Sequence, residues 1–134
     1  MNYYLRSRPE RKIAIVGSRG YTNLDWVRTV VVSLPEGSMV ITGGAPGVDR
    51  VAESTAARYH IPLYVFLAAW DVQGRAAGPA RNTKIVEASD ELIAFWDGKS
   101  RGTLDSIRKA RARGIPVKVY DPAGVLWDNA RVLP

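Results

Sequence analysis

Short apolar runs alternate with segments of helical periodicity along the chain. The runs are rich in β-branched and aromatic residues and end at turn residues, as strands buried on both faces do. We expect strands at residues 12–16, 39–42, 63–67, 92–96 and 117–120, and helices at about 27–34, 48–59, 79–88 and 103–113. Strands joined through helices make right-handed crossovers, so the alternation predicts a parallel sheet covered by helices. The fold class is therefore α/β, a Rossmann-like three-layer domain with about five strands.

Three glycine-rich turns follow three of the predicted strands, at residues 17–20, 43–49 and 97–103. A strand that ends in glycines and opens into a helix presents free backbone N–H groups, which suit a phosphate. In such sheets ligands bind at the carboxyl ends of strands, where the strand order reverses. The order 3-2-1-4-5 is assumed, because spacing does not determine it. In that order the three turns meet at one crevice and predict a nucleotide or other phosphorylated ligand.

The candidate binding residues come from these turns and from the segment before the third helix. Hydroxyls and guanidinium groups suit phosphate, and glycines either admit a ligand or serve the turn conformation. The first-turn carboxylate of Asp49 either caps free N–H groups or binds ribose hydroxyls. The set is Gly17, Ser18, Arg19, Gly43, Gly44, Ala45, Gly47, Val48, Asp49, Trp70, Arg81, Asn82, Trp96, Ser100, Gly102 and Thr103.

Arg81 is the most informative member of this set. We expect it in the first turn of a helix, where a cation opposes the helix dipole. Either a bound phosphate or a salt bridge to Asp71 or Asp90 would compensate. Trp70 and Trp96 flank the crevice, where each either stacks on a base or packs in the core.

Composition bounds the remaining possibilities. We expect one domain over residues 1–134, with a core at about 12–120, a basic arm at 1–11, and a tail at 121–134 that packs on the domain or on a partner subunit. The chain has no cysteine and one histidine, which excludes disulfides, thiolate catalysis and multi-histidine metal sites. We expect no metal, no required cofactor, no membrane contact and a cytoplasmic location. The net charge of +6 fits an anionic partner or simply solubility.

Taken together, the motifs at 17–19, 42–49, 69–70, 78–82 and 94–103 resemble the YspA/YpsA-related branch of the SLOG superfamily, named after the Smf/DprA and LOG proteins. The resemblance covers about residues 12–120. It implies a Rossmann-like fold that binds nucleotides or nucleotide-derived ligands such as ADP-ribose. It also favours a homodimer.

The LOG enzymes of this superfamily hydrolyse the N-glycosidic bond of nucleoside 5′-monophosphates. Arg81 matches their arginine, and Gly102 with Thr103 matches the end of their glycine-rich turn. Their catalytic glutamate falls on Ser106, which cannot stabilise an oxocarbenium-like centre as a carboxylate does. If the chain is a phosphoribohydrolase, Arg81 and Asp97 are the catalytic candidates, with Asp49 or Asp105 as other sources of the carboxylate.

Three functions remain, in order of expectation. The first is a binding module or sensor for a small nucleotide-derived ligand. The second is a LOG-like phosphoribohydrolase. The third is a single-stranded nucleic-acid binder, as in the DNA-processing relatives. Nucleic acid is ranked as an unlikely partner because only the positive charge favours it.

Overall fold

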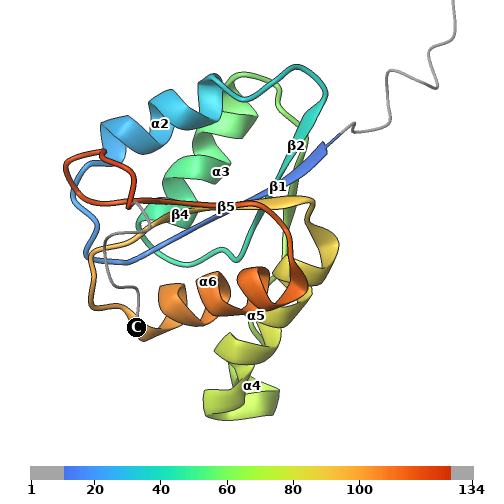
Figure 1. Ribbon diagram of the computed structural model, residues 1–134. Helices are drawn as coiled ribbons and strands as arrows, with labels where there is room; N and C mark the ends of the chain where they lie inside the picture. The colour runs from blue at the N-terminus through green and yellow to red at the C-terminus, as the bar shows by residue number, and fades with distance from the viewer. Residues whose placement is uncertain (1–10, 128–134) are drawn as a thin grey trace, which may run out of the picture.

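The computed structural model describes residues 11–127 as a parallel sheet between two pairs of helices (Figure 1). Helices α2 and α3 cover one face of the sheet, and α5 and α6 cover the other (Figure 1). The elements are β1 (Arg11–Gly17), α2 (Leu24–Val32), β2 (Ser38–Thr42), α3 (Val48–Arg58), β3 (Leu63–Val65), α4 (Trp70–Gln73), a 3-10 turn (Gly74–Ala76), α5 (Ala77–Ala88), β4 (Glu91–Phe95), α6 (Arg101–Arg113) and β5 (Val117–Tyr120).

The sheet has the order β3-β2-β1-β4-β5, and every neighbouring pair is parallel. In the central strand β1, Ala14 pairs with Ile41 on one side and with Leu92 on the other. This confirms the α/β Rossmann-like fold and the assumed strand order. The order reverses between β1 and β4, so the turns that follow these two strands lie at the reversal point.

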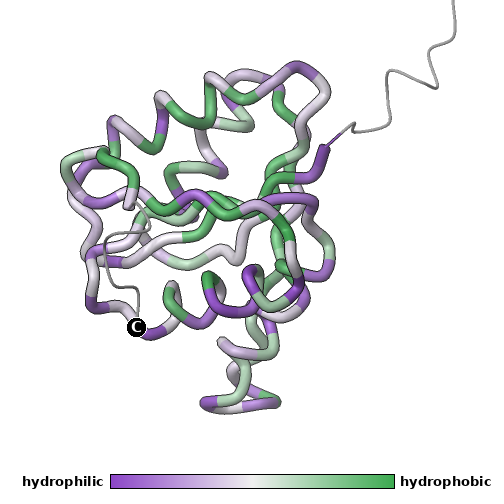
Figure 2. Tube along the Cα trace, in the orientation of Figure 1, coloured by the Kyte–Doolittle hydropathy of each residue, from purple (hydrophilic) through white to green (hydrophobic). Residues whose placement is uncertain are grey.

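The core consists of two apolar layers, one on each face of the sheet. Ile13 and Ile15 of β1 pack with α2 and α3, whereas Ala14 and Val16 pack with α5 and α6. Because successive strand residues point to opposite faces, a strand covered on both sides must be apolar throughout. Figure 2 shows this pattern as hydrophobic strands between helices of mixed character.

The segment between β3 and α5, where no helix or strand was expected, contains short helices. It contains α4 and the 3-10 turn, and α5 begins at Ala77 rather than near Pro79. Pro79 is tolerated as the third residue of α5 because the first-turn N–H groups have no intrahelical acceptor. Arg81 consequently lies in the second turn, so the predicted first-turn position was wrong. The dipole argument for an anion beside it loses force.

The C-terminal segment packs on the domain as far as the structure describes it. Leu126 forms an antiparallel bridge with Tyr120, and the backbone N–H of Trp127 donates to the Val119 carbonyl at 2.8 Å. The Trp127 ring lies 5.4 Å from that of Trp96. The rest of the predicted tail (128–134), and all but Arg11 of the predicted basic arm, lie outside the described residues. Arg11 itself belongs to β1. None of the helices within residues 11–127 is both long and apolar enough to cross a bilayer.

Candidate functional site

A cleft of about 530 Å³ opens at the carboxyl edge of the sheet, at the reversal between β1 and β4. The three glycine-rich turns, the segment from α4 to the start of α5, and the first turns of α6 all contribute to it. The lining residues are Val16, Gly17, Arg19, Gly20, Ala45, Asp49, Trp70, Gly78, Pro79, Arg81, Asn82, Ile85, Asp97, Ser100, Arg101, Gly102, Thr103, Asp105 and Ser106.

Six of the predicted binding residues do not line the cleft. They are Ser18, Gly43, Gly44, Gly47, Val48 and Trp96. Ser18 is buried, and its Oγ lies 3.3 Å from the Thr103 hydroxyl and accepts from the Asp97 N–H at 3.2 Å. Trp96 is 2% exposed, and its Nε1 donates to the Ser100 carbonyl at 3.0 Å. Both side chains therefore hold the first and third turns in place instead of facing the cleft.

Gly17 is needed for packing at the end of β1. A Cβ at this position would lie 2.5 Å from the side chain of Val48, the first residue of α3. Any larger residue would push α3 away from the sheet. The glycine thus lets two elements approach each other closely, whether or not a ligand contacts it.

The second turn is closed by the protein's own carboxylate. Asp49 is 4% exposed and accepts from the Gly43 N–H at 3.0 Å and the Ala45 N–H at 3.2 Å. Burial raises the pKa of Asp49 to about 6, although these hydrogen bonds and the Arg81 guanidinium favour the ionised form. The prediction of free amides is wrong for Gly43 and Ala45, because a neighbouring side chain takes them. Of the two roles weighed for Asp49, capping is the observed one.

The third turn keeps two amides open. Asp97 Oδ1 accepts from the N–H groups of Lys99 and Ser100, both at 2.8 Å. Partial burial raises the pKa of Asp97, but these hydrogen bonds outweigh it and the net shift is downward. Ser100 Oγ caps α6 by accepting from the Thr103 N–H. The remaining first-turn amides, of Arg101 and Gly102, have no acceptor among residues 11–127.

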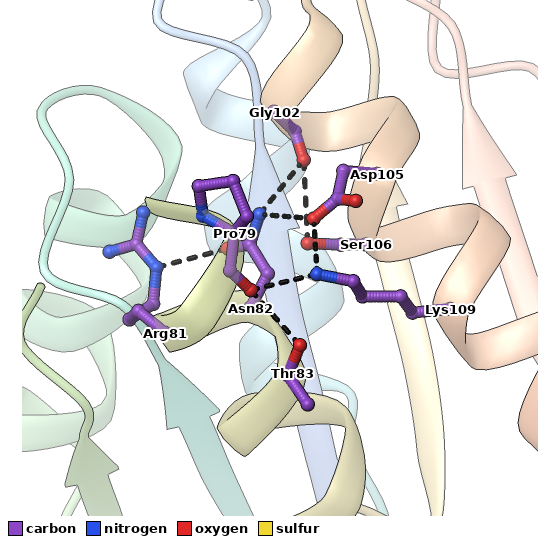
Figure 3. A network of polar contacts seen from close by, with 8 residues as sticks. All are labelled: Pro79, Arg81, Asn82, Thr83, Gly102, Asp105, Ser106 and Lys109. Carbon is purple, nitrogen blue, oxygen red and sulfur yellow. Dashed lines mark hydrogen bonds and ion pairs between the residues drawn. The ribbon is translucent and has the colours of Figure 1, made fainter. Parts of the chain in front are cut away.

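A polar network joins the starts of α5 and α6 (Figure 3). Asn82 Nδ2 donates to the Gly102 carbonyl at 3.2 Å and to Asp105 Oδ2 at 3.1 Å. Its Oδ1 accepts from Arg81 Nε at 3.0 Å, and Arg81 Nη1 donates to the Gly43 carbonyl. Asn82 and Arg81 thus connect α5 to α6 and to the second turn, and set the width of the cleft.

The carboxylate nearest the LOG glutamate position is already paired. Asp105 lies 2.9 Å from Lys109 Nζ, which also donates to the Pro79 carbonyl at 2.7 Å (Figure 3). Ser106 is buried and donates to the Gly102 carbonyl at 3.5 Å. Neither residue is poised for catalysis in this arrangement, and LOG-like hydrolysis stays a prediction. Asp90, a suggested partner of Arg81, instead accepts from the Lys12 N–H.

The charge balance of the cleft follows from these contacts. Its three carboxylates, at Asp49, Asp97 and Asp105, are all held by donors of the protein itself. The guanidinium groups of Arg19 and Arg101 are exposed and have no carboxylate partner within the described range. The cleft is therefore suited to an anion.

Sequence reasoning missed Arg101 as a site residue. The signal was present, since it is a basic residue in the first turn of a helix that follows a strand. We had applied the first-turn argument to Arg81 instead, but Arg81 lies in the second turn of its helix.

The fold and cleft define a Rossmann-like domain with a cleft at the carboxyl edge of its sheet. Residues 4–71 match the sequence profile of the family DNA recombination-mediator protein A. The chain is also 33% identical, over 117 residues, to the Gene 61 protein of Mycobacterium phage D29, covering 80% of this chain and 94% of that protein. The chain belongs to the DNA recombination-mediator protein A family.

Two solved structures share the fold. DNA processing protein A from Helicobacter pylori, which is described for its single-stranded DNA binding mode, has a TM-score of 0.65 at 22% identity over 89% of this chain and 68% of that one. DprA from Streptococcus pneumoniae has a TM-score of 0.70 at 22% identity, over 90% of this chain and 52% of that one.

These findings correct the predicted partner. Nucleic acid was ranked as unlikely and a small nucleotide as the ligand, whereas the family match and the DNA-binding relative point to nucleic acid. The ranking was wrong because it rested on net charge alone, which does not distinguish a small nucleotide from a nucleic acid. The comparisons support the Smf/DprA side of the predicted superfamily; the YspA/YpsA-related branch and the homodimer stay predictions.

Proposed function

We propose that this protein binds single-stranded DNA in the cleft at the carboxyl edge of its sheet. The observation that carries the proposal is a pair of guanidinium groups, those of Arg19 and Arg101, that have no carboxylate partner among residues 11–127 and line the cleft together with the open amides of α6. Family membership and the relative described for single-stranded DNA binding support it.

The phosphates of the strand are the groups that these donors recognise. A phosphate at the start of α6 accepts from the amides of Arg101 and Gly102 and lies at the positive end of the helix dipole. Arg19 and Arg101 add charge-assisted hydrogen bonds from either side. Because these contacts reach the backbone and no base edge, they bind without sequence preference.

Replacing Arg101 tests the proposal. Arg101→Ala should weaken binding of a short oligodeoxythymidine about tenfold, as expected for the loss of one charged hydrogen bond. It should also reduce the log–log slope of affinity against salt by about 0.7, the value for one phosphate on a single strand. Fluorescence anisotropy of a labelled oligonucleotide at several salt concentrations measures both quantities.

Arg111→Ala is the matched control, because Arg111 is exposed on the same helix and carries the same charge. It lies ten residues further along, roughly 15 Å from Arg101 at the rise of an α-helix. This variant should bind the oligonucleotide within about twofold of the native protein. Equal losses in the two variants would mean that net charge alone drives binding and that the cleft is not the site. No binding by the native protein would refute the function itself.

A further inference from the structure

Trp70 is an aromatic side chain that the fold leaves uncovered. Its side chain lines the cleft, yet the residue is 55% exposed. It begins the short helix α4, in the segment for which the sequence predicted no helix or strand. Burying an indole is strongly favourable, so one left open at the rim of a cleft suggests a ligand that covers it.

The ring of Trp70 is held in place from behind. A Cβ built on Gly78 would lie 3.1 Å from Trp70 Cη2, so the six-membered ring rests against the backbone of α5. Gly78 is buried and also lines the cleft. A side chain at this position would displace the indole. The aromatic surface is thus positioned before any ligand arrives, which lowers the entropy lost on binding.

Trp70 shares the cleft with the basic groups that would take phosphates. Arg19, in the first turn, lines the same space, as does Arg101 at the start of α6. A nucleotide unit carries a negative phosphate and a flat base, and these two parts need different surfaces. The cleft offers guanidinium and amide donors for the first part and one exposed indole for the second.

We infer that Trp70 stacks on an unpaired base of the bound strand, an inference that rests on the proposed single-stranded DNA binding. Every base has a π-face, so stacking adds affinity without sequence preference. A duplex keeps its bases stacked on one another and offers no free face to the indole. Trp70 would therefore make the cleft selective for unpaired strands.

The experiment compares two oligonucleotides of the same length, an oligodeoxythymidine and one made of abasic sites. Trp70→Ala should weaken binding of the thymidine strand about tenfold, within the range found for loss of one stacked base. It should leave binding of the abasic strand within about twofold, since the phosphate contacts are unchanged. Trp70→Phe should retain most of the affinity for the thymidine strand. The tryptophan fluorescence of the native protein should be quenched by the thymidine strand, and this quenching should be lost in Trp70→Phe.

Val72→Ala is the matched control, because Val72 is an exposed apolar residue of the same short helix that does not line the cleft. It should bind both strands as the native protein does. Three results would overturn the stacking role: equal native affinity for the two strands, equal losses on both strands in Trp70→Ala, or quenching that persists in Trp70→Phe. The proposed function survives each of these. If the native protein binds neither strand, the proposed function fails and the stacking role with it.

Discussion

Asp49 is the residue whose environment differs most from that of a free side chain. It is buried under the second turn, where it takes two backbone amides as hydrogen-bond donors. Its pKa is raised from 3.8 to about 6, chiefly because burial disfavours the charged form. The second turn therefore depends on the Asp49 carboxyl as a hydrogen-bond acceptor, and ionisation of this carboxyl lowers the free energy of unfolding.

This shift predicts how stability changes with pH. Between about pH 4 and pH 6 the folded protein retains a proton that the unfolded chain has lost. The contribution of Asp49 to the free energy of unfolding is thus largest below pH 4, and it falls by about 3 kcal/mol as the pH rises to 6. Asp49→Asn keeps an acceptor oxygen for the amides but carries no charge. It should remove this fall and be more stable than the native protein above pH 6.

Urea unfolding of both proteins at pH 4, 5, 6 and 7 measures the difference directly. Asp71→Asn is the control, because Asp71 is exposed on α4 and its replacement should leave the pH dependence unchanged. If the native protein and Asp49→Asn show the same pH dependence, the buried carboxylate does not act as described.

The roles of individual site residues were the feature of the site that was hardest to predict from sequence. For Asp49, capping was weighed against ribose binding, and Asp97 was a catalytic candidate; the structure shows each carboxylate bonded to backbone amides. Such pairings depend on side-chain directions that a motif does not encode. Trp70 is a contrasting case, because its position in the cleft agrees with the sequence-based expectation.

At the scale of elements, the close contact between the end of β1 and the start of α3 determines the position of the base of the cleft. Gly17→Ala would place a Cβ 2.5 Å from Val48 and should lower the free energy of unfolding by about 1–3 kcal/mol, the usual cost of overpacking. Val48→Ala alone should also destabilise, because it leaves a cavity.

The double variant Gly17→Ala/Val48→Ala distinguishes packing from other causes. If the two side chains compete for the same space, the double variant loses less stability than the sum of the single losses, with a coupling of at least about 0.5 kcal/mol. Urea unfolding of the four proteins completes the cycle. Strictly additive losses would show that Gly17 is needed for some reason other than the approach of α3.

Elements with a strong periodic pattern were predictable, and the segment before α5 was not. The runs that became β1, β2 and β4 are strands with a continuous apolar stretch that is mostly buried, whereas β5, at the edge of the sheet, has the exposed Lys118 between two valines. Helix α4 has only four residues, no side-chain cap and no buried residue. Its helical conformation comes from docking beside α5, and local sequence carries little signal for that.

At the scale of the whole molecule, the alternation of strand and helix was enough to predict the parallel sheet, and the cleft lies at the edge of the sheet where a ligand was expected. The choice of ligand was not predictable in the same way. Net charge favoured an anion, but only the structure shows that the cleft's carboxylates are paired internally while Arg19 and Arg101 stay open. The balance of charge in a cleft depends on pairings between residues far apart in sequence.

The most direct test of the account is to map where single-stranded DNA contacts the protein. Titrating the ¹⁵N-labelled protein with a short oligodeoxythymidine should shift the backbone amide resonances of the first and third turns and of the first residues of α6, with Arg101 and Gly102 among the largest. The amides of α2, and those of α3 beyond its first turn, should stay unchanged. Shifts concentrated on α2 and α3, with the cleft amides unmoved, would contradict the placement of the strand in the cleft.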